Sequence, residues 1–348
     1  MLLKKSARMP KEGITKILIR GTNWIGDAVL TLPAIASVRA AYPQARISIL
    51  AKPLVADVYK LFTAADEIII YKFDNPLGVF RLASILRKKK FDAAILLQNA
   101  IEAAIMVCAA RIKLRGGYNS DGRGFLLTHS IKRTKEIRKV HQIDYYLEMV
   151  KALGCAPVGR EMHLQARINR VTAQNTLHEF IPGPEKPVVG IAPGATYGPA
   201  KRWFPERFAE VADKISANYG CHIVLLGGKD DWKVAQQVCA KSSTDLINLA
   251  GKTTLREAIY LISQCVLFIS NDSGLMHIAG ALNVPTVAIF GSTNPLTTSP
   301  VGEKIKIVRE EVSCSPCLKE TCPTDFRCMD LVKVDDVLSA ARDILKCN

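Results

Sequence analysis

Seven residues, Asn271–His277, combine polar side chains with a glycine in a pattern that suits anion binding. They follow the apolar run 266–269, typical of a buried strand, and precede the apolar run 278–282, typical of a helix. The first N–H groups of a helix lack partners, and its dipole places partial positive charge there. Ser273 and Gly274 would let a phosphate approach that end closely. An ordinary strand-to-helix turn capped by its own polar side chains would look the same.

The residues that follow extend this pattern. A second apolar run, 285–290, ends in the polar segment 291–295. Two buried strands, each followed by a polar loop, suggest a nucleotide-diphosphate ligand at the carboxyl edge of a parallel sheet.

A glycine-bearing turn near the N-terminus offers different chemistry. The apolar strand 17–20 is followed by Gly21-Thr-Asn-Trp-Ile-Gly26-Asp27. The two glycines have the spacing of a P-loop, but Asp27 stands near the position of its lysine and would repel a triphosphate. A carboxylate at the top of a strand can instead accept a proton from a sugar hydroxyl. Asp27 also suits the N-cap of a helix over 28–41, and the two roles are compatible.

A third block lies in mid-chain. The apolar strand 188–192 leads into Pro193-Gly-Ala-Thr196, and then into Lys201-Arg-Trp-Phe-Pro205. A lysine at the mouth of a sheet can neutralise a departing diphosphate, and it contributes most in the transition state, where that charge grows. Taken alone, Lys201 would more often be a solvated surface charge.

These three blocks, in this order and spacing, resemble the lipopolysaccharide heptosyltransferases of glycosyltransferase family 9, and the likeness spans nearly the whole chain. The form of the glycine turn and the cysteine-bearing tail look most like the type II branch. The resemblance implies that Asp27 is the general base and that Lys201 contacts the donor's phosphate and sugar. The other residues that it places at the donor are Thr196, Asp272, Ser273, Gly274, Leu275, Lys229, Asp230 and Thr253. His277 would either contact a phosphate or pack beneath the loop.

The resemblance also implies a reaction. Heptose would pass, with inversion, from ADP-L-glycero-D-manno-heptose to the first heptose of the lipopolysaccharide inner core. Three alternatives stay open: a type I or other family 9 transferase, a non-catalytic nucleotide- or glycolipid-binding protein, and a sugar epimerase on the same scaffold. The chain contains no Asp-x-Asp, the element that holds a metal in GT-A transferases. We therefore expect no cofactor or metal to be required for catalysis.

The net charge of +15 is unevenly distributed. Residues 1–170 hold 29 Lys and Arg against 13 Asp and Glu, whereas residues 171–348 hold 18 against 19. Such an asymmetry predicts an anionic partner for the first half, and the partners that fit are nucleic acid, an anionic membrane face and a phosphorylated glycolipid. No nucleic-acid-binding motif accompanies the charge, so we expect no nucleic acid. There is no signal peptide and no apolar run long enough to span a membrane, which predicts a cytoplasmic protein, peripheral at the inner membrane.

Strand and helix patterns alternate in both halves, which indicates parallel sheets covered by helices. The expected strands are 16–20, 46–50, 67–71, 92–97, 111–115, 188–192, 221–226, 246–249, 266–270 and 285–290. We expect an α/β protein of GT-B architecture, with two doubly wound Rossmann-like domains facing across a cleft. The acceptor domain would be 1–168 and the nucleotide-sugar domain 169–348. In GT-B proteins the last helix, here 334–347, often returns to the first domain.

Ten cysteines are present. Six read as small core residues of a reducing compartment: Cys108, Cys155, Cys221, Cys239, Cys265 and Cys347. The other four, Cys314, Cys317, Cys322 and Cys328, lie within fifteen positions. Their spacing suits a structural zinc ion, although a loop of reduced thiols or a labile disulfide fits as well. Four thiolates would leave such an ion no open position for catalysis.

Overall fold

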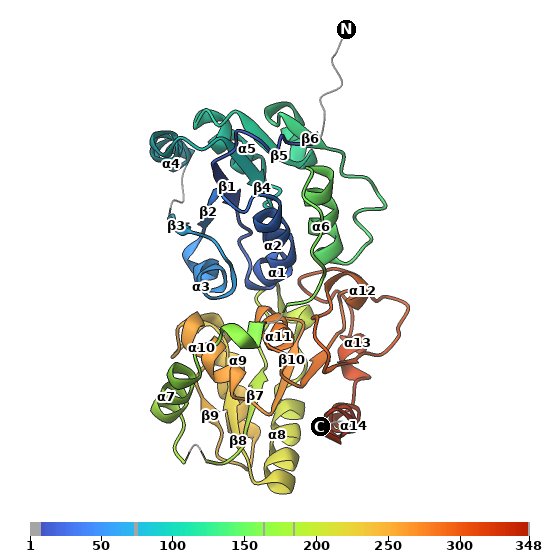
Figure 1. Cartoon of the computed structure of the whole chain (residues 1–348). Coiled ribbons are helices and arrows are strands. Elements are labelled where there is room, and N and C mark those ends of the chain that lie inside the picture. The colour runs from blue at the N-terminus through green and yellow to red at the C-terminus, as the bar shows by residue number, and fades with distance from the viewer. Residues whose placement is uncertain (1–7, 73–75, 163, 184, 347–348) are drawn as a thin grey trace. The chain divides into compact units, whose positions relative to one another are not determined.

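The structure is a computed structural model that describes residues 8–72, 76–162, 164–183 and 185–346. The chain divides into two compact units, Met1–Glu161 and Met162–Asn348. Each unit contains a six-stranded sheet with helices on both faces (Figure 1). The predicted fold class is therefore confirmed at the level of each unit.

The first sheet has the order β3-β2-β1-β4-β5-β6, and every neighbouring pair is parallel. Its strands are β1 (Lys16–Arg20), β2 (Arg46–Ala51), β3 (Glu67–Ile70), β4 (Ala93–Leu96), β5 (Leu114–Tyr118) and β6 (His129–Ile131). The central strands β1 and β4 are almost wholly buried, because helices cover both faces.

Two helix layers cover this sheet. The helices α4 (Pro76–Lys89) and α5 (Ile101–Ala109) pack with Leu18, Leu50 and Ala94 of the strands in one apolar core. The other helices pack against one another in pairs: α1 (Ile25–Leu30) with α3 (Pro53–Phe62), and α2 (Leu32–Ala41) with α6 (Gln142–Ala152). A short 3-10 segment, η1 (Ser120–Leu126), lies against α5.

The second sheet has the order β12-β11-β10-β7-β8-β9 and is also parallel throughout. Its strands are β7 (Val188–Ala192), β8 (His222–Leu225), β9 (Ile247–Asn248), β10 (Leu267–Asn271), β11 (Thr286–Ile289) and β12 (Ile305–Val308). The same pattern of buried central strands is present, since β7 and β10 are buried along their whole length.

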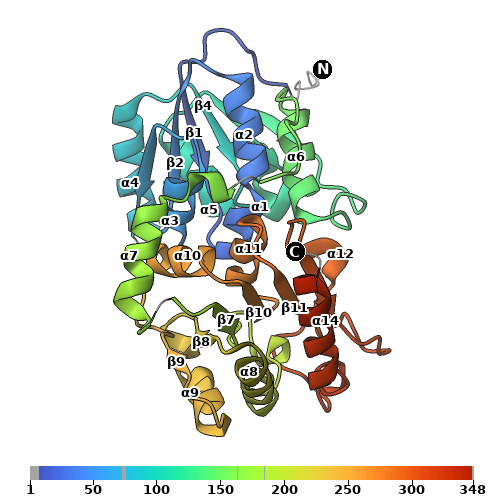
Figure 2. The same cartoon turned by 60° about the horizontal axis from the view of Figure 1, so that its bottom comes forward.

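The helices of the second unit also form two layers. The main core contains α8 (Pro205–Tyr219), α9 (Trp232–Lys241) and α14 (Val334–Lys346). In the other layer, α10 (Leu255–Ser263) packs with both α7 (Arg170–Phe180) and α11 (Gly274–Ala281). Short helical turns are η2 (Leu164–Arg167), η3 (Pro199–Lys201), η4 (Lys229–Asp231), α12 (Pro295–Thr298) and α13 (Arg327–Asp330). Figure 2 shows α14 running beside β11.

Within the second unit, α14 packs on β11, β12 and α8. The two compact units divide after Glu161. One sequence expectation needs correction. The helix predicted over 28–41 is two helices separated by Thr31, whose hydroxyl donates to the Ala28 carbonyl at 2.7 Å.

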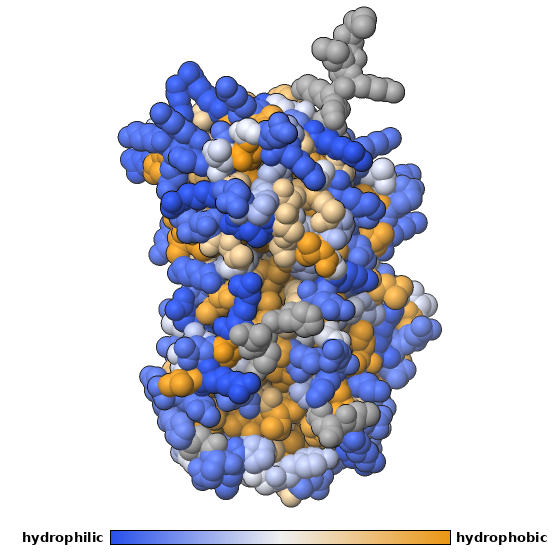
Figure 3. All heavy atoms as spheres, viewed as in Figure 1, coloured by the Kyte–Doolittle hydropathy of each residue, from blue (hydrophilic) through white to orange (hydrophobic). Residues whose placement is uncertain are grey.

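The surface of the described residues is mainly hydrophilic on the face that Figure 3 shows. Among the described residues, no helix combines the length and the apolar character that crossing a bilayer requires. Of the predicted core cysteines, Cys155, Cys221 and Cys265 are buried, while Cys108 and Cys239 are partly exposed. Cys347, at the predicted end of the last helix, lies outside the described residues.

Candidate functional site

The order of the second sheet reverses between its two central strands, β7 and β10. At such a point the loops after the two strands run in opposite directions and leave a crevice, where ligands of open α/β sheets bind. The loop after β7 leads to η3 and ends in Lys201. Asp272 directly follows β10. Two of the predicted donor residues therefore come from the two strands that flank this reversal.

Lys201 and Asp272 form an ion pair. The Lys201 Nζ donates to Asp272 Oδ2 at 2.6 Å, and the side chains are 15% and 4% exposed. The same Oδ2 accepts the Thr293 hydroxyl at 2.7 Å. Lys201 Nζ also lies 5.1 Å from the centre of the Tyr197 ring, within the range of a cation–π contact. These contacts hold an ammonium group at the sheet edge. Sequence reasoning missed Thr293, although it lies in the polar segment after β11.

Asn271 ties the two loops together. Its Nδ2 donates to the Pro193 carbonyl at 2.8 Å, and its Oδ1 accepts the Trp203 N–H at 3.0 Å. Trp203 is fully buried and packs edge-on against Phe208. The segment that carries Lys201 is thus anchored at both ends to the last residue of β10.

The predicted anion-binding helix is α11, which begins at Gly274. Ser273 is its N-cap in an extended conformation, and its hydroxyl makes no capping bond to the helix but lies 3.0 Å from the Ser270 hydroxyl. Gly274 and Leu275 are partly exposed, whereas His277 is buried. The first turn of α11 therefore presents backbone N–H groups beside Asp272, an arrangement suited to a phosphate.

The loops after β8 and β9 lie together at the same edge. The Gly251 N–H donates to the Gly227 carbonyl at 3.0 Å, which joins the two loops. Lys229 and Asp230 are exposed on η4, and Thr253 is partly buried just before α10. Thr196, in the loop after β7, is exposed. All of these predicted residues therefore lie on loops that follow strands of the second sheet.

Asp231 is more buried than the adjacent Asp230, which the sequence predicted as the site residue. Its Oδ2 accepts the Gly228 N–H at 2.9 Å, while its Oδ1 is buried without a hydrogen-bond partner. Burial raises the pKa of Asp231, because a charged carboxylate loses its hydration there. A buried polar atom without a partner at a loop edge is a candidate contact for a ligand hydroxyl or for water.

Asp27, in the first unit, is partly exposed and occupies the third position of α1. The helix begins two residues earlier, after the N-cap Trp24, so the interpretation of Asp27 as an N-cap is wrong. A carboxylate in a first turn is favoured by the helix dipole. The Asp27 carboxylate acts electrostatically on the buried Tyr146 of α6. Burial raises the pKa of Tyr146 well above its ordinary value, and the negative charge of Asp27 raises that pKa further.

Tyr59 of α3 supports the turn that precedes Asp27. Its hydroxyl accepts the Thr22 N–H at 3.0 Å and lies 3.2 Å from the Thr22 hydroxyl. A Cβ at Gly21 would lie 2.7 Å from a ring carbon of Tyr59, so only glycine fits at this position. Beneath the turn, the buried Arg20 donates to the Gly21 carbonyl, to Asn23 and to the Tyr71 hydroxyl. The turn is thus held from both sides at the end of β1, the strand beside the reversal of the first sheet.

Among the described residues, no three His, Cys, Asp or Glu side chains are close enough, as they stand, to hold a metal ion. Each of the two units contains a parallel six-stranded sheet covered by helices. This fold matches the GT-B class of glycosyltransferases. Residues 79–326 match the model of glycosyltransferase family 9 (heptosyltransferase), and the chain belongs to that family.

Individual relatives agree. The chain is 30% identical over 307 residues to lipopolysaccharide heptosyltransferase 2 of Escherichia coli K12, which covers 84% of this chain and 88% of that protein. It is 29% identical over 340 residues to lipooligosaccharide heptosyltransferase 2 of Campylobacter jejuni, covering 95% and 98%. Among solved structures, E. coli ADP-heptose LPS heptosyltransferase II matches with a TM-score of 0.83 at 27% identity, covering 95% and 99%.

Proposed function

We propose that this heptosyltransferase moves heptose from ADP-heptose to the first heptose of the lipopolysaccharide inner core. The observation that carries the donor half of this proposal is the Lys201–Asp272 ion pair beside the N-terminus of α11. The acceptor half is supported by the likeness to heptosyltransferases 2, at about 30% identity over 84% of the chain.

The second unit would hold ADP-heptose. The first N–H groups of α11, Lys201 and Thr196 suit the diphosphate, and the loops that carry Lys229 and Thr253 suit the nucleoside. An ammonium group has three N–H donors, so Lys201 can keep its bond to Asp272 while it donates to a phosphate oxygen. Asp272 would thereby fix the position of the lysine, and we expect it to lie near the donor sugar.

Asp27 of the first unit would act as the base. The acceptor hydroxyl oxygen attacks the anomeric carbon of heptose from the face opposite ADP and gives its proton to the Asp27 carboxylate. The bond between the anomeric carbon and the diphosphate oxygen breaks, and ADP leaves with both electrons of that bond. Lys201 and the α11 N-terminus stabilise the charge that grows on this leaving group, while the new glycosidic bond has inverted configuration.

The charge of the first unit supports an anionic acceptor at a membrane surface. Exposed cations occur at the end of α4, at Arg87, Lys88 and Lys90, and in the segment 132–139. A phosphorylated glycolipid in the cytoplasmic leaflet of the inner membrane presents the opposite charge, and each basic residue near such a surface adds about 1 kcal/mol of attraction. We therefore place the protein in the cytoplasm, at the inner membrane face.

The acceptor is tested by mixing the protein with ADP-heptose and either heptosyl-Kdo2-lipid A or Kdo2-lipid A. ADP release and the mass of the glycolipid are followed. We expect the mass to rise by one heptose on the first acceptor and not on the second. Transfer to Kdo2-lipid A alone would contradict the type II proposal and establish a type I enzyme. Donor binding without transfer to either acceptor would favour a binding protein.

A further inference from the structure

A cysteine-lined cavity of about 90 Å³ lies in the second unit, between β12 and α14 in the chain. It is lined by all four cysteines of one loop, Cys314, Cys317, Cys322 and Cys328. None of the four forms a disulfide. Four thiols around one small cavity are the ligand set of a structural, thiophilic metal ion such as zinc or iron.

Other groups around the cavity suit a thiolate site. The Phe326 N–H donates to Cys322 Sγ at 3.3 Å, and the Thr324 hydroxyl lies 3.5 Å from the same sulfur. The Ser292 hydroxyl, on a residue only 1% exposed, lines the cavity and has no hydrogen-bond partner. A bound thiolate would supply the acceptor that this buried hydroxyl lacks. Lys319 also lines the cavity and would offset part of the negative charge of a tetrathiolate, whereas the lining Arg327 is already paired with Asp325 at 2.9 Å.

We propose that these four cysteines bind one divalent metal ion as thiolates and that the metal holds the Lys201 loop in place. As they stand, no three of the thiols meet around a single point, so binding requires the side chains to turn into the cavity that they line. Each thiol gives up its proton when it binds. The ion is structural, because four thiolates leave no open coordination position.

The cysteine loop packs directly on the segment that precedes Lys201. The Ala200 N–H donates to the Glu320 carbonyl at 3.0 Å, and the Tyr197 hydroxyl donates to the Leu318 carbonyl at 2.8 Å. At Gly198, with φ +156°, a Cβ would lie 2.3 Å from the Glu320 carbonyl oxygen. The two backbones therefore touch at a position where no side chain fits.

The loop also reaches the carboxylate of the ion pair. The Leu318 N–H donates to the Ser292 carbonyl at 2.9 Å. Ser292 precedes Thr293, whose hydroxyl donates to Asp272. Both members of the Lys201–Asp272 pair are thus in contact with segments that the cysteine loop supports.

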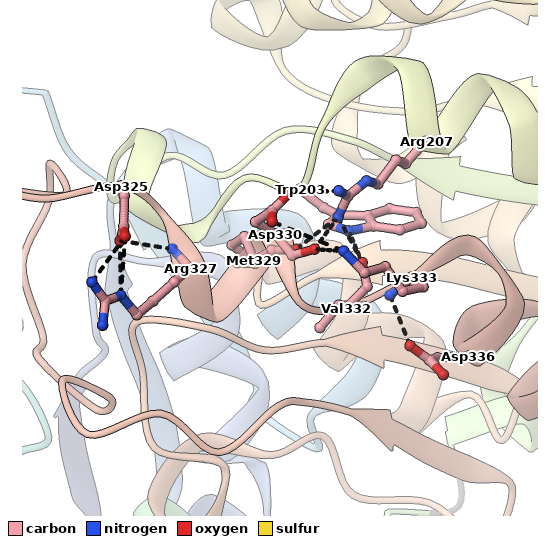
Figure 4. Close-up of polar contacts among 9 residues, drawn as sticks. All are labelled: Trp203, Arg207, Asp325, Arg327, Met329, Asp330, Val332, Lys333 and Asp336. Atoms are coloured by element: carbon pink, nitrogen blue, oxygen red, sulfur yellow. Dashed lines mark hydrogen bonds and ion pairs between the residues drawn. The ribbon is translucent and has the colours of Figure 1, made fainter.

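The far end of the loop is anchored to the start of α8, as Figure 4 shows. The Arg207 guanidinium donates to the carbonyls of Met329, at 3.2 Å, and Val332, at 2.8 Å. The Trp203 indole N–H donates to the same Val332 carbonyl at 3.1 Å. Cys328 lies on α13, within this anchored stretch, so it is a fixed ligand around which the more exposed thiols can close.

Metal binding is tested without reference to the reaction. The protein is purified without chelator from medium supplemented with zinc and iron, and its metals are measured by plasma mass spectrometry. We expect about one ion per chain in the wild type and in the control Cys239→Ser, and less than a tenth of that in the double variant Cys317→Ser/Cys322→Ser. The same measurement identifies the bound element as zinc or iron.

A second measurement keeps the test valid if the double variant fails to fold. Reduced wild-type protein is stripped of metal and titrated with Co²⁺, whose visible bands and intensity report four sulfur ligands in a tetrahedron. A saturable 1:1 endpoint supports the site. If neither metal content nor Co²⁺ binding appears, or if the cysteines are recovered as disulfides, the proposal is wrong.

The positioning role rests on the proposed function, so it is measured separately. If the metal holds the Lys201 loop in place, removing the metal should raise the KM for ADP-heptose at least fivefold, with a smaller change in kcat. Adding the metal back should restore the original KM. Unchanged kinetics in metal-free protein would contradict the positioning role. Because metal content is measured without the donor, a failure of the proposed reaction would leave the metal result intact.

Discussion

Lys201 and Asp272 lie 71 positions apart in the chain, yet the Lys201 ammonium is 2.6 Å from the Asp272 carboxylate at the reversal of the second sheet. The parallel order of β7 and β10 brings the loops after both strands to one edge. The two side chains depend on each other, because the Asp272 carboxylate is buried and the Lys201 ammonium supplies its counter-charge.

Replacing Lys201 separates its role in catalysis from its role in stability. Lys201→Ala should lower kcat/KM for ADP-heptose by about 100- to 1000-fold, the size expected when a donor to a leaving group's charge is lost. It should also reduce the free energy of unfolding by about 3 kcal/mol, because the Asp272 carboxylate stays buried without its partner. Steady-state kinetics and urea denaturation measure the two effects.

A double variant provides the control. Lys201→Met with Asp272→Asn removes both charges and keeps an acceptor for the Thr293 hydroxyl. We expect most of the lost stability to return while kcat/KM stays low. Recovery of activity in the double variant would show that the lysine serves only to neutralise Asp272.

Tyr59 determines the shape of the turn before Asp27. Tyr59→Phe removes the acceptor of the buried Thr22 N–H, which should cost about 1–3 kcal/mol of stability. Because Gly21 packs on the same ring, the turn should loosen and kcat should fall with little change in donor affinity. The exposed Tyr219→Phe, with an expected change below about 0.5 kcal/mol, is the matched control. Equal stability of the two variants would exclude this role.

Asp213 makes part of the stability dependent on pH. Burial raises the pKa of its carboxyl, but hydrogen bonds from Ser242, Ser243 and Thr244 outweigh burial and lower the pKa to about 2 from an ordinary 3.8. A carboxyl with a lowered pKa in the folded state contributes stability above its ordinary pKa, and loses it as the pH falls toward its folded pKa. The contribution is therefore complete at pH 7 and declines between about pH 4 and pH 2.

The matching variant is Asp213→Asn. It should lower the free energy of unfolding by about 1 kcal/mol at pH 7, a value reduced for solvent screening of this partly exposed group. The difference from wild type should shrink as the pH falls below 4. Urea unfolding at pH 7, 5, 4 and 3 measures it, with the exposed Asp245→Asn as control. A difference that is constant with pH would contradict the assignment.

Much of the fold could be predicted because buried parallel strands are short, continuous apolar runs. The predicted ranges of β1 and β7 match the observed ones residue for residue. The two strands that were missed, β6 and β12, are edge strands. The former has three residues, and the latter alternates apolar residues with a lysine, so neither has an apolar run. The strand expected at 111–115 is observed three residues later, as β5, where Gly116 and Gly117 weaken the apolar pattern.

The sequence predicted which residues lie near the site, but not which of their side chains touch. Motif spacing placed Lys201, Asp272 and the α11 N-terminus near one sheet edge. Their pairing, and the hydroxyl of Thr293, depend on the order of the strands, which no local pattern contains. The sequence alone also could not show that Asp231 is more buried than Asp230. Which of two adjacent carboxylates is buried depends on how the loop folds around them.

The central claim is most directly tested by Asp27→Asn, measured in one experiment for binding and turnover. Calorimetry with ADP-heptose reports donor affinity, and glycolipid mass reports transfer to heptosyl-Kdo2-lipid A. The account predicts wild-type affinity for the donor and a kcat lowered by about 100- to 10,000-fold, since only the base is lost. Turnover within a few-fold of wild type would contradict the role of Asp27 and with it the proposed mechanism.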